Sequence, residues 1–372
     1  MGLNLVNANK RLNLKEQEAQ MRSYKERVLE GSDIYVGVDV HLKQWHVTIL
    51  HEEEELFSGN IPGHWEDLEK LLSRYARDRI YVVYEAGYSG FWLHDQLLEW
   101  GANCIVTPPS LLPVESGNRV KTDKRDSRKL AYLLSRGMLK AIWVPSREEC
   151  LNREVIRRRR QLVWDRVRVQ NRIKSALYFY GIELAKPRGR WSTVYVKNLW
   201  SLRLGNKFAQ ESFWRFLEVY EDLCRQIEKQ TSLLKELSLT DRYRDQVAIL
   251  CSVYGIAMIS AMEILLELGD IARFRRGEQL AAYVGLTPSQ HSSGDKVRMG
   301  HITRAGKGAL RGTLIEVAWL LIRHDSGMNE KYLRIRRNSG SKRAIVAIAR
   351  RLLLCLRRML LEKRPYYLEA AA

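Results

Sequence analysis

The stretch that decides the fold is Ile34-Tyr-Val-Gly-Val-Asp-Val40, a run of mostly β-branched residues. Such residues favour strands, and successive side chains of a strand point to opposite faces of the sheet. The run therefore predicts a strand with Tyr35, Gly37 and Asp39 on one face, the face that His41 would continue. A carboxylate in an apolar strand is costly to bury unless it is paired or binds a metal, so Asp39 is a candidate functional residue.

Further strands and helices alternate on the C-terminal side of this run. Apolar, β-branched segments predict strands at 45–50, 56–57, 80–84, 102–106 and 141–144. Helical patterns occupy 64–76, 90–100 and the segment from Asp123 onward. Three strands followed by alternating helices and strands predict a mixed α/β sheet.

Three more acids follow these predicted strands. Glu85 comes directly after the strand at 80–84, and Asp123 and Asp126 lie in Lys121-Thr-Asp-Lys-Arg-Asp126. A spacing of three places the two aspartates on the same side of a helix. Taken singly, each acid has an ordinary explanation, such as a salt bridge or, for Asp123, a helix N-cap.

The order of the four acids favours a functional interpretation. Carboxylates on a first strand, after a central strand and on a later helix match an RNase H-like sheet, where they hold two divalent ions. Hard oxygen ligands beside phosphate indicate Mg²⁺ or Mn²⁺. The sequence therefore predicts one metal site formed by Asp39, Glu85, Asp123 and Asp126.

Residues 150–240 have the periodicity of paired helices. Val155, Leu162, Val169 and Ala176 recur every seven residues, and a second apolar seam runs over 213–237 with Gln230 inside it. Such spacing predicts a coiled-coil-like pair, either a hairpin within the chain or a dimer interface. The same segment carries four consecutive arginines, which suit either a solvated face or nucleic-acid contact: Arg157, Arg158, Arg159 and Arg160.

The C-terminal part contains two features that suit phosphate. Two apolar helical runs flank a tight turn at Gly255, which predicts either a helix-hairpin-helix that grips a phosphate backbone or an ordinary helical turn. Downstream, Ser293-Gly294 lies in a polar loop, and a Ser-Gly pair is ordinarily a turn. Cations follow it at Lys296, Arg298, Arg304, Lys307 and Arg311. Charge alone indicates phosphate binding and does not make Ser293 catalytic.

Composition narrows the class of partner. The 372-residue chain has a formal net charge of +19, with 16 Lys/Arg against 5 Asp/Glu in residues 301–372. This excess favours a nucleic acid over other partners. No apolar run reaches the ~20 residues of a membrane span, and no signal peptide precedes the first strand. Five scattered cysteines without a Cys-x-x-Cys pair argue against a zinc knuckle or disulfide framework. We expect a bacterial, cytoplasmic, nucleoid-associated protein.

The ordered motifs resemble the DEDD transposases of bacterial insertion sequences and the related Piv-type DNA invertases. The resemblance is carried in the N-terminal half by Val36-Gly-Val-Asp39, Tyr84-Glu-Ala-Gly-Tyr88 and Lys121-Thr-Asp. In the C-terminal half it is carried by Leu266-Glu-Leu-Gly-Asp270, Leu280-Ala-Ala-Tyr-Val-Gly-Leu-Thr-Pro288, Ser293-Gly294 and Ile302-Thr-Arg-Ala-Gly306. The chain departs from the family at the hairpin, where Tyr254-Gly-Ile-Ala257 replaces the usual Pro-Gly-Ile-Gly.

The resemblance implies a RuvC-like fold with Asp39, Glu85, Asp123 and Asp126 as metal ligands and Ser293 as the covalent nucleophile. It also implies strand exchange on DNA, sites combined from different subunits of a dimer or tetramer, and a structured guide RNA. The expected parts are an N-terminal extension (1–31), a RuvC-like domain (32–148), a helical linker (149–243) and a serine-bearing, mainly helical domain (244–372). Nucleic-acid contacts are predicted for Lys121, Arg125, Arg157, Arg158, Arg159, Arg160, Gly255, Lys296, Arg298, Arg304, Lys307 and Arg311.

Two other functions compete with this one. A structure-specific nuclease of the Holliday-junction type needs the four acids but no serine. A non-catalytic nucleic-acid-binding scaffold needs neither, and the complete acid set argues against it.

Overall fold

The computed structural model describes residues 31–113, 122–183, 191–290, 299–303 and 305–367. The chain divides into two compact units, residues 1–147 and 148–372, and each is described by itself. The further division at 243 and the N-terminal extension stay predictions.

The first unit is built on a five-stranded mixed sheet. Its strands are β1 (Ile34–Val40), β2 (Gln44–His51), β3 (Glu54–Pro62), β4 (Ile80–Glu85) and β5 (Asn103–Thr107). Their order across the sheet is β3-β2-β1-β4-β5. β1, β2 and β3 pair antiparallel, whereas β4 runs parallel to β1 and β5 parallel to β4. The predicted mixed α/β sheet and its first strand are confirmed, and β1 has the predicted bounds.

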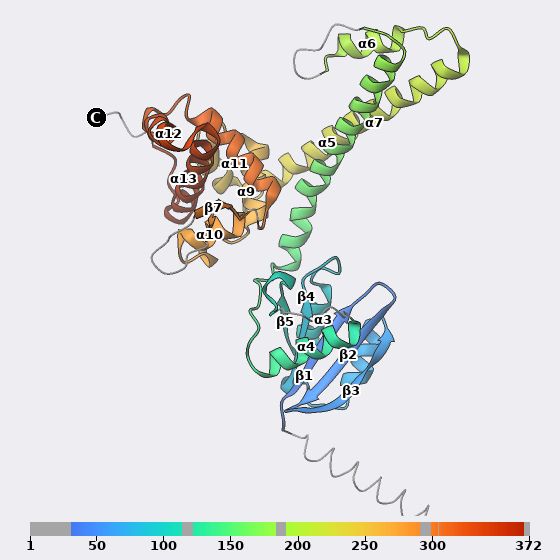
Figure 1. Cartoon of the computed structure of the whole chain (residues 1–372), viewed down its shortest axis with the longest axis vertical. Helices are drawn as coiled ribbons and strands as arrows, with labels where there is room; N and C mark the ends of the chain where they lie inside the picture. The colour runs from blue at the N-terminus through green and yellow to red at the C-terminus, as the bar shows by residue number, and fades with distance from the viewer. Residues whose placement is uncertain (1–30, 114–121, 184–190, 291–298, 304, 368–372) are drawn as a thin grey trace, which may run out of the picture. The chain divides into compact units, whose positions relative to one another are not determined.

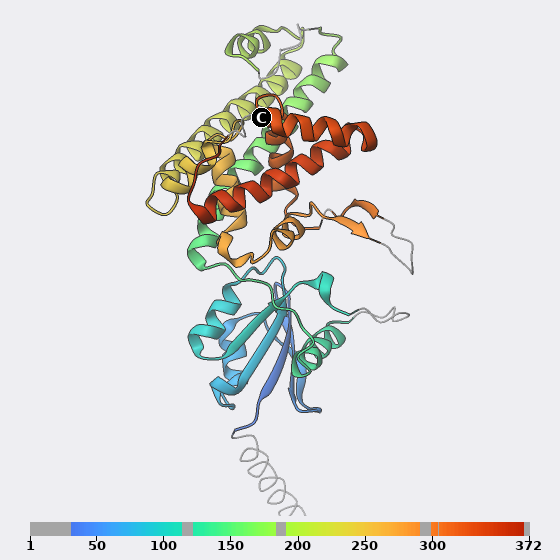
Figure 2. The ribbon, with the colours of Figure 1, turned by 90° about the vertical axis from the view of Figure 1, so that its left-hand side faces the viewer.

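Helices cover both faces of this sheet (Figure 2). On one face, Val36 and Val38 join a core with leucines of α2 (Trp65–Leu72) and α3 (Trp92–Trp100). On the other face, α4 (Asp123–Ser135) lies across β1 and β2 (Figure 1). Because side chains alternate along a strand, Gly37 and Asp39 point toward the α4 face. Two short 3₁₀ turns complete the unit, η1 (Arg77–Arg79) and η2 (Pro109–Leu111).

Two sequence-based expectations in this unit are wrong. Residues 141–144 form no strand, because a single backbone hydrogen bond, from Ile142 N to Val106 O, joins them to β5. A ladder needs repeated bonds, and Pro145 follows the segment at once. Asp123 is the first residue of α4 and not its N-cap. Thr122 caps the helix instead, since its side chain accepts a hydrogen bond from Arg125 N.

The second unit begins with two long helices. α5 (Arg147–Phe179) and α7 (Lys207–Ser238) are joined through α6 (Thr193–Ser201). Buried residues of all three helices share one apolar cluster, including Ile173, Leu199 and Leu217. The Gln230 side-chain amide donates to the backbone carbonyl of Val155, 3.0 Å away. The predicted helical pair therefore packs as a hairpin within the chain, and the dimer interface stays a prediction.

The rest of the second unit is mainly helical. Its elements are α8 (Arg244–Cys251), α9 (Met258–Leu268), η3 (Ile271–Arg273), α10 (Gly277–Val284), α11 (Gly308–Leu321), α12 (Ser326–Ser339) and α13 (Ser341–Glu362), with a hairpin of β6 (Pro288–Gln290) and β7 (Met299–Ile302). Every residue from Ala261 to Leu268 is buried, so α9 forms the centre of the core. Among the described helices, none combines the length and apolarity needed to span a bilayer.

Candidate active site

Asp39 lies at the carboxyl end of β1, where a histidine approaches it. Asp39 Oδ2 lies 3.3 Å from His41 Nε2, and Asp123 Oδ1 of α4 lies 3.7 Å from the same nitrogen. The Trp45 indole N–H donates to the His41 carbonyl and thereby holds the backbone that carries the imidazole. Asp39, His41 and Asp123 therefore form one cluster at the end of the strand.

Glu85 ends the neighbouring strand on the same face of the sheet. β4 pairs parallel with β1, with Val38 opposite Tyr84, so Asp39 and Glu85 are the next residues along the two strands. In-register residues on adjacent strands point to the same face. The Tyr88 hydroxyl donates to the Val40 carbonyl, 2.9 Å away, and ties the loop after β4 to the end of β1. The register brings the two residues to neighbouring positions of the sheet, and their joint role as ligands stays a prediction.

Gly37 allows α4 to approach β1 closely. A Cβ atom at this position would lie 2.0 Å from the Ser127 carbonyl oxygen and 2.7 Å from Ala131 N. Real carbon atoms do not approach backbone atoms this closely. The glycine thus lets the first turn of α4, with Asp123 and Asp126, pack over the strand that carries Asp39.

A buried polar cluster fixes α4 against the sheet. The Ser127 hydroxyl lies 2.8 Å from His46 Nδ1 and 2.8 Å from Thr48 Oγ1, both on β2. Ser127 and Thr48 are fully buried. Burial lowers the pKa of His46, which favours the neutral imidazole. Because unpaired buried hydroxyls are costly, this cluster favours one position of α4, and with it of Asp126.

Sequence reasoning placed His41 on the face of Asp39 but gave none of these supporting residues a role. His41 lies two residues after Asp39, and an Asp-x-His spacing at a strand end was the signal that could have identified it. His46 and Ser127 gave no comparable signal, because their contact joins residues 81 positions apart.

The donor atoms at this cluster suit a divalent cation. One ligand atom from each of Asp39, His41 and Asp123 lies within 4.8 Å of the other two. Burial raises the pKa of Asp39, with His41 opposing the rise and the neighbouring carboxylates Asp123 and Asp126 adding to it. Carboxylates suit Mg²⁺ and Mn²⁺, and an imidazole in the set moves the preference toward Mn²⁺ and softer metals. The residues therefore fit a bound divalent cation.

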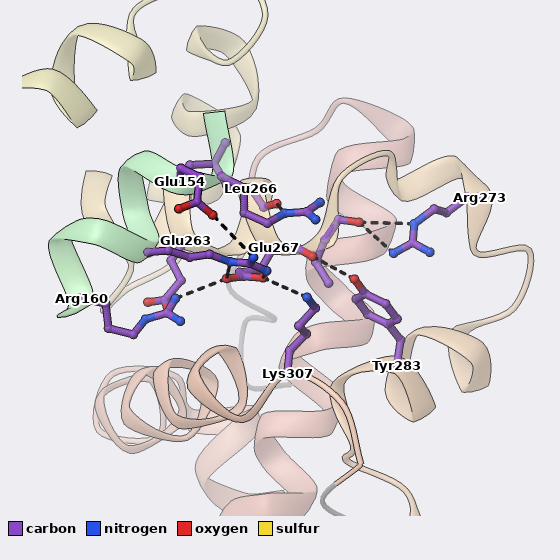
Figure 3. A network of polar contacts seen from close by, with 11 residues as sticks. Glu154, Arg160, Glu263, Leu266, Glu267, Arg273, Tyr283 and Lys307 are labelled. Carbon is purple, nitrogen blue, oxygen red and sulfur yellow. Dashed lines mark hydrogen bonds and ion pairs between the residues drawn. The ribbon is translucent and has the colours of Figure 1, made fainter. Parts of the chain in front are cut away.

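The arginine run of α5 has partners within the second unit. Arg157 donates two hydrogen bonds to Glu267, both 3.1 Å long, and Arg160 Nη2 lies 2.6 Å from Glu263 Oε1. Arg159 donates to the Thr231 hydroxyl. Figure 3 shows the Arg160 side chain pointing toward Glu263 of α9. Three of the four predicted nucleic-acid contacts thus hold helices together, and Arg158 remains exposed beside Gln161.

Glu267 is the centre of this network. Its side chain is 3% exposed, and Lys307 Nζ approaches it to 3.3 Å. Burial by itself would raise the pKa of Glu267, but Arg157, Lys307 and Arg153 outweigh it and lower the pKa to about 2. The carboxylate is therefore compensated by several cations, unlike Asp39.

The other predicted contact residues are placed as follows. Gly255 has φ +91°, and a Cβ there would lie 2.9 Å from Leu320 Cβ of α11, so the turn needs glycine for packing. The guanidinium of Arg311 donates to the Val284 carbonyl, and Arg125 lies exposed in the first turn of α4. Phosphate contacts by these groups stay predictions. Lys121, Ser293, Lys296, Arg298 and Arg304 lie outside the described residues.

Comparison with known proteins matches both units. Residues 36–182 match the DEDD transposase model of IS110 elements, and residues 247–333 match the model of the transposase IS116/IS110/IS902 family. A protein of Sinorhizobium fredii that carries the name transposase is 29% identical, over 90% of this chain and 83% of its own length. The transposase for insertion sequence element IS1533 of Leptospira borgpetersenii is 26% identical, over 89% of this chain and 97% of its own. A pilin gene-inverting protein of Moraxella bovis is 23% identical, over 90% of this chain and 98% of its own length.

Proposed function

The chain belongs to the DEDD transposases of the IS110/IS116 type, and from that premise we propose that it exchanges DNA strands through a serine-linked intermediate at a metal-dependent acid site. The single observation that supports the acid site best is the convergence of β1 and α4 on one cluster, Asp39, His41 and Asp123.

The proposed fold of the first unit is RNase H-like. The strand order β3-β2-β1-β4-β5, with three antiparallel strands followed by two parallel ones, supports it. In this proposal Asp39, Glu85, Asp123 and Asp126 are the ligands. A bound divalent cation would supply charge stabilisation to the phosphoryl group and lower the pKa of the attacking hydroxyl.

Other residues of the chain position the acid site. Asp39 and Asp123 would hold the cation, and His41 keeps both carboxylates in place. Tyr88 fixes the adjoining loop against β1. The buried Ser127 cluster keeps the first turn of α4 in register with the sheet.

The covalent step is assigned to Ser293. Its hydroxyl oxygen forms a bond to the scissile phosphorus, the bond from that phosphorus to the leaving strand's oxygen breaks, and the leaving oxygen takes up a proton. The hydroxyl of a new strand then attacks the phosphoserine phosphorus and returns the serine hydroxyl. The number of phosphoester bonds is conserved, so rejoining needs no nucleotide cofactor.

The proposal also includes partners. The net charge of +19 supports a nucleic-acid partner, and the family resemblance implies a structured guide RNA and self-association. We propose that the acids of one subunit act with the serine of another.

A donor plasmid that carries the gene with its own flanking DNA tests the serine. Excision is measured by amplification across the rejoined junction, so the assay works whatever the target sequence is. Ser293→Ala should abolish the junction product, and the neighbouring Ser292→Ala is the matched control that should retain it. Normal recombination by Ser293→Ala would contradict the covalent route and favour the junction-nuclease alternative.

Mixing two inactive variants tests the shared site. Coexpression of Ser293→Ala with Asp39→Asn should restore part of the excision, because some pairings contain one intact acid site and one intact serine. A mixture that stays inactive, while both variants still bind nucleic acid and self-associate, would contradict the shared-site proposal alone.

A further inference from the structure

A cavity of about 930 Å³ lies between the β6–β7 hairpin and the N-terminal end of α13. One wall is apolar and includes Pro288, Ile302 and Val346. The other carries three cations, Lys342, Arg343 and Arg350. Ligand sites commonly combine an apolar lining with a few placed polar groups in a volume of this size.

The three cations have no partner in the part of the chain that the structure describes. Lys342 and Arg343 are exposed. Arg350 is half-buried and lies about two turns after Arg343 on the same side of α13. This contrasts with Arg157 and Arg160, whose guanidinium groups are bonded to buried carboxylates. Unpaired cations gathered around a cavity attract an anionic ligand.

The backbone at the cavity adds to the preference for an anionic ligand. Gly340, with φ +79°, is the N-cap of α13, a helix of 22 residues. The first-turn amides that follow it, including those of Ser341 and Lys342, lack partners within the helix. They favour negative charge, and phosphate in particular, beside the three cations.

The lining fits a nucleotide better than a free anion or a duplex. A phosphate would lie at the cationic wall, and the sugar or base would contact Pro288, Ile302 and Val346. A free phosphate would leave the apolar wall exposed to water and would gain nothing from burying it. A duplex exposes phosphates on its outside and keeps its base faces stacked, so its bases cannot reach such a wall.

The cavity is lined by the two strands between which the serine lies in the sequence. Pro288 of β6 and Ile302 of β7 line it, and Ser293 follows β6 by three residues in the sequence. We propose that this cavity holds a nucleotide of the single DNA strand beside the bond on which Ser293 acts. The inference rests on the proposed function for its substrate, while the binding itself is measured separately.

Fluorescence anisotropy with a labelled 12-mer of oligothymidylate tests the binding. Arg343→Gln/Arg350→Gln in the full chain should weaken affinity by roughly tenfold and reduce the salt slope by about 1.4, the value for two lost contacts on a single strand. Arg334→Gln/Arg336→Gln on α12 is the matched control, since it removes the same charge from an exposed helix outside the cavity. Equal weakening by both variants would overturn the proposal.

Two further experiments test the kind of strand that binds and where it binds. If the cavity variant weakens binding of oligouridylate RNA but not of the DNA 12-mer, the proposal of a DNA strand is overturned. Ultraviolet crosslinking of a 5-iododeoxyuridine 12-mer should yield a labelled peptide within 286–302 or 341–350, and labelling elsewhere would overturn it.

A Ser293→Ala variant separates this inference from the proposed function. The variant should bind the 12-mer with wild-type affinity, because it leaves every described lining residue of the cavity unchanged. If Ser293→Ala recombines normally while the cavity variant still loses affinity, the proposed function fails and the nucleotide site stands. If the cavity variant binds normally while Ser293→Ala is inactive, the cavity inference alone fails.

Discussion

Two carboxylate clusters in the described part of the chain differ in how far neighbouring cations compensate their charge. At the end of β1, Asp39 and Asp123 share one described ion-pair partner, His41. On α9, Glu263 and Glu267 face Arg157, Arg160 and Lys307. The pKa of Asp39 is raised, chiefly by burial, whereas that of Glu267 is lowered to about 2 although burial opposes the shift.

The difference separates a structural charge cluster from the cluster for which we propose a function. Buried carboxylates surrounded by cations are stable as they are, and removing one leaves charges unpaired. Carboxylates held close together with little compensation cost stability, and such arrangements persist at sites where a ligand supplies the missing charge. Removal of an acid should therefore have opposite consequences at the two places.

The largest effect is expected from Asp39→Asn. Excision from a donor plasmid with native flanks should fall on the order of a thousandfold or more, because charge stabilisation at the phosphoryl group is lost. The melting temperature should stay the same or rise, since one repelling carboxylate is removed. Glu66→Gln, an exposed acid of α2, is the control and should excise normally. A large drop in melting temperature with Asp39→Asn would make the residue structural.

Glu267→Gln should lower the stability of the fold, in contrast to Asp39→Asn. Its removal leaves Arg157, Arg160 and Lys307 without their shared partner, and breaking such a buried network costs about 3–5 kcal/mol of unfolding free energy. Urea unfolding of the full chain measures it, with the exposed Glu330→Gln of α12 as the control. Unchanged stability would show that the network contributes nothing to the fold.

The stabilisation by Glu267 should depend on pH. A carboxyl with a lowered folded-state pKa stabilises the fold above its unfolded pKa of about 4.5 and loses that contribution as the pH falls toward 2. The unfolding free energies of wild type and Glu267→Gln then differ by on the order of 3 kcal/mol at pH 6, and this difference shrinks below pH 4.5. A difference that stays constant from pH 6 to pH 3 would contradict the low pKa.

The smallest effect on stability should come from Arg158→Gln. Arg158 is exposed, so unfolding free energy should change by no more than about 0.5 kcal/mol, whereas Arg157→Gln should lower it by several times more. If Arg158 contacts a phosphate of duplex DNA, the salt slope should fall by about 0.9. A stability loss equal to that of Arg157→Gln would remove the distinction between the two arginines.

The sequence predicted local features well and long-range partners poorly. The strand at 34–40 and the start of the helix near Asp123 follow from alternation and capping, which act over a few residues. Residues 141–144 have strand-like composition, yet one hydrogen bond to β5 makes no ladder.

The arginines of α5 show the limit most clearly. Four consecutive cations suited either a solvated face or nucleic-acid contact, and the sequence did not indicate that Glu263 and Glu267, more than 100 residues away, pair with two of them. The Ser127 contacts with His46 and Thr48 also join distant positions, 81 and 79 residues apart. Such pairings depend on the tertiary fold, and no local pattern encodes them.

The central claim is that the acids at the end of β1 bind a divalent cation, and direct Mn²⁺ binding tests it. Paramagnetic resonance of free Mn²⁺ gives the affinity of the full chain without any nucleic acid. Wild type and Glu267→Gln, below its melting temperature, should bind alike, whereas Asp39→Asn and Asp123→Asn should each bind at least about tenfold more weakly, as loss of a ligand predicts. Undiminished Mn²⁺ binding by Asp39→Asn would contradict the claim.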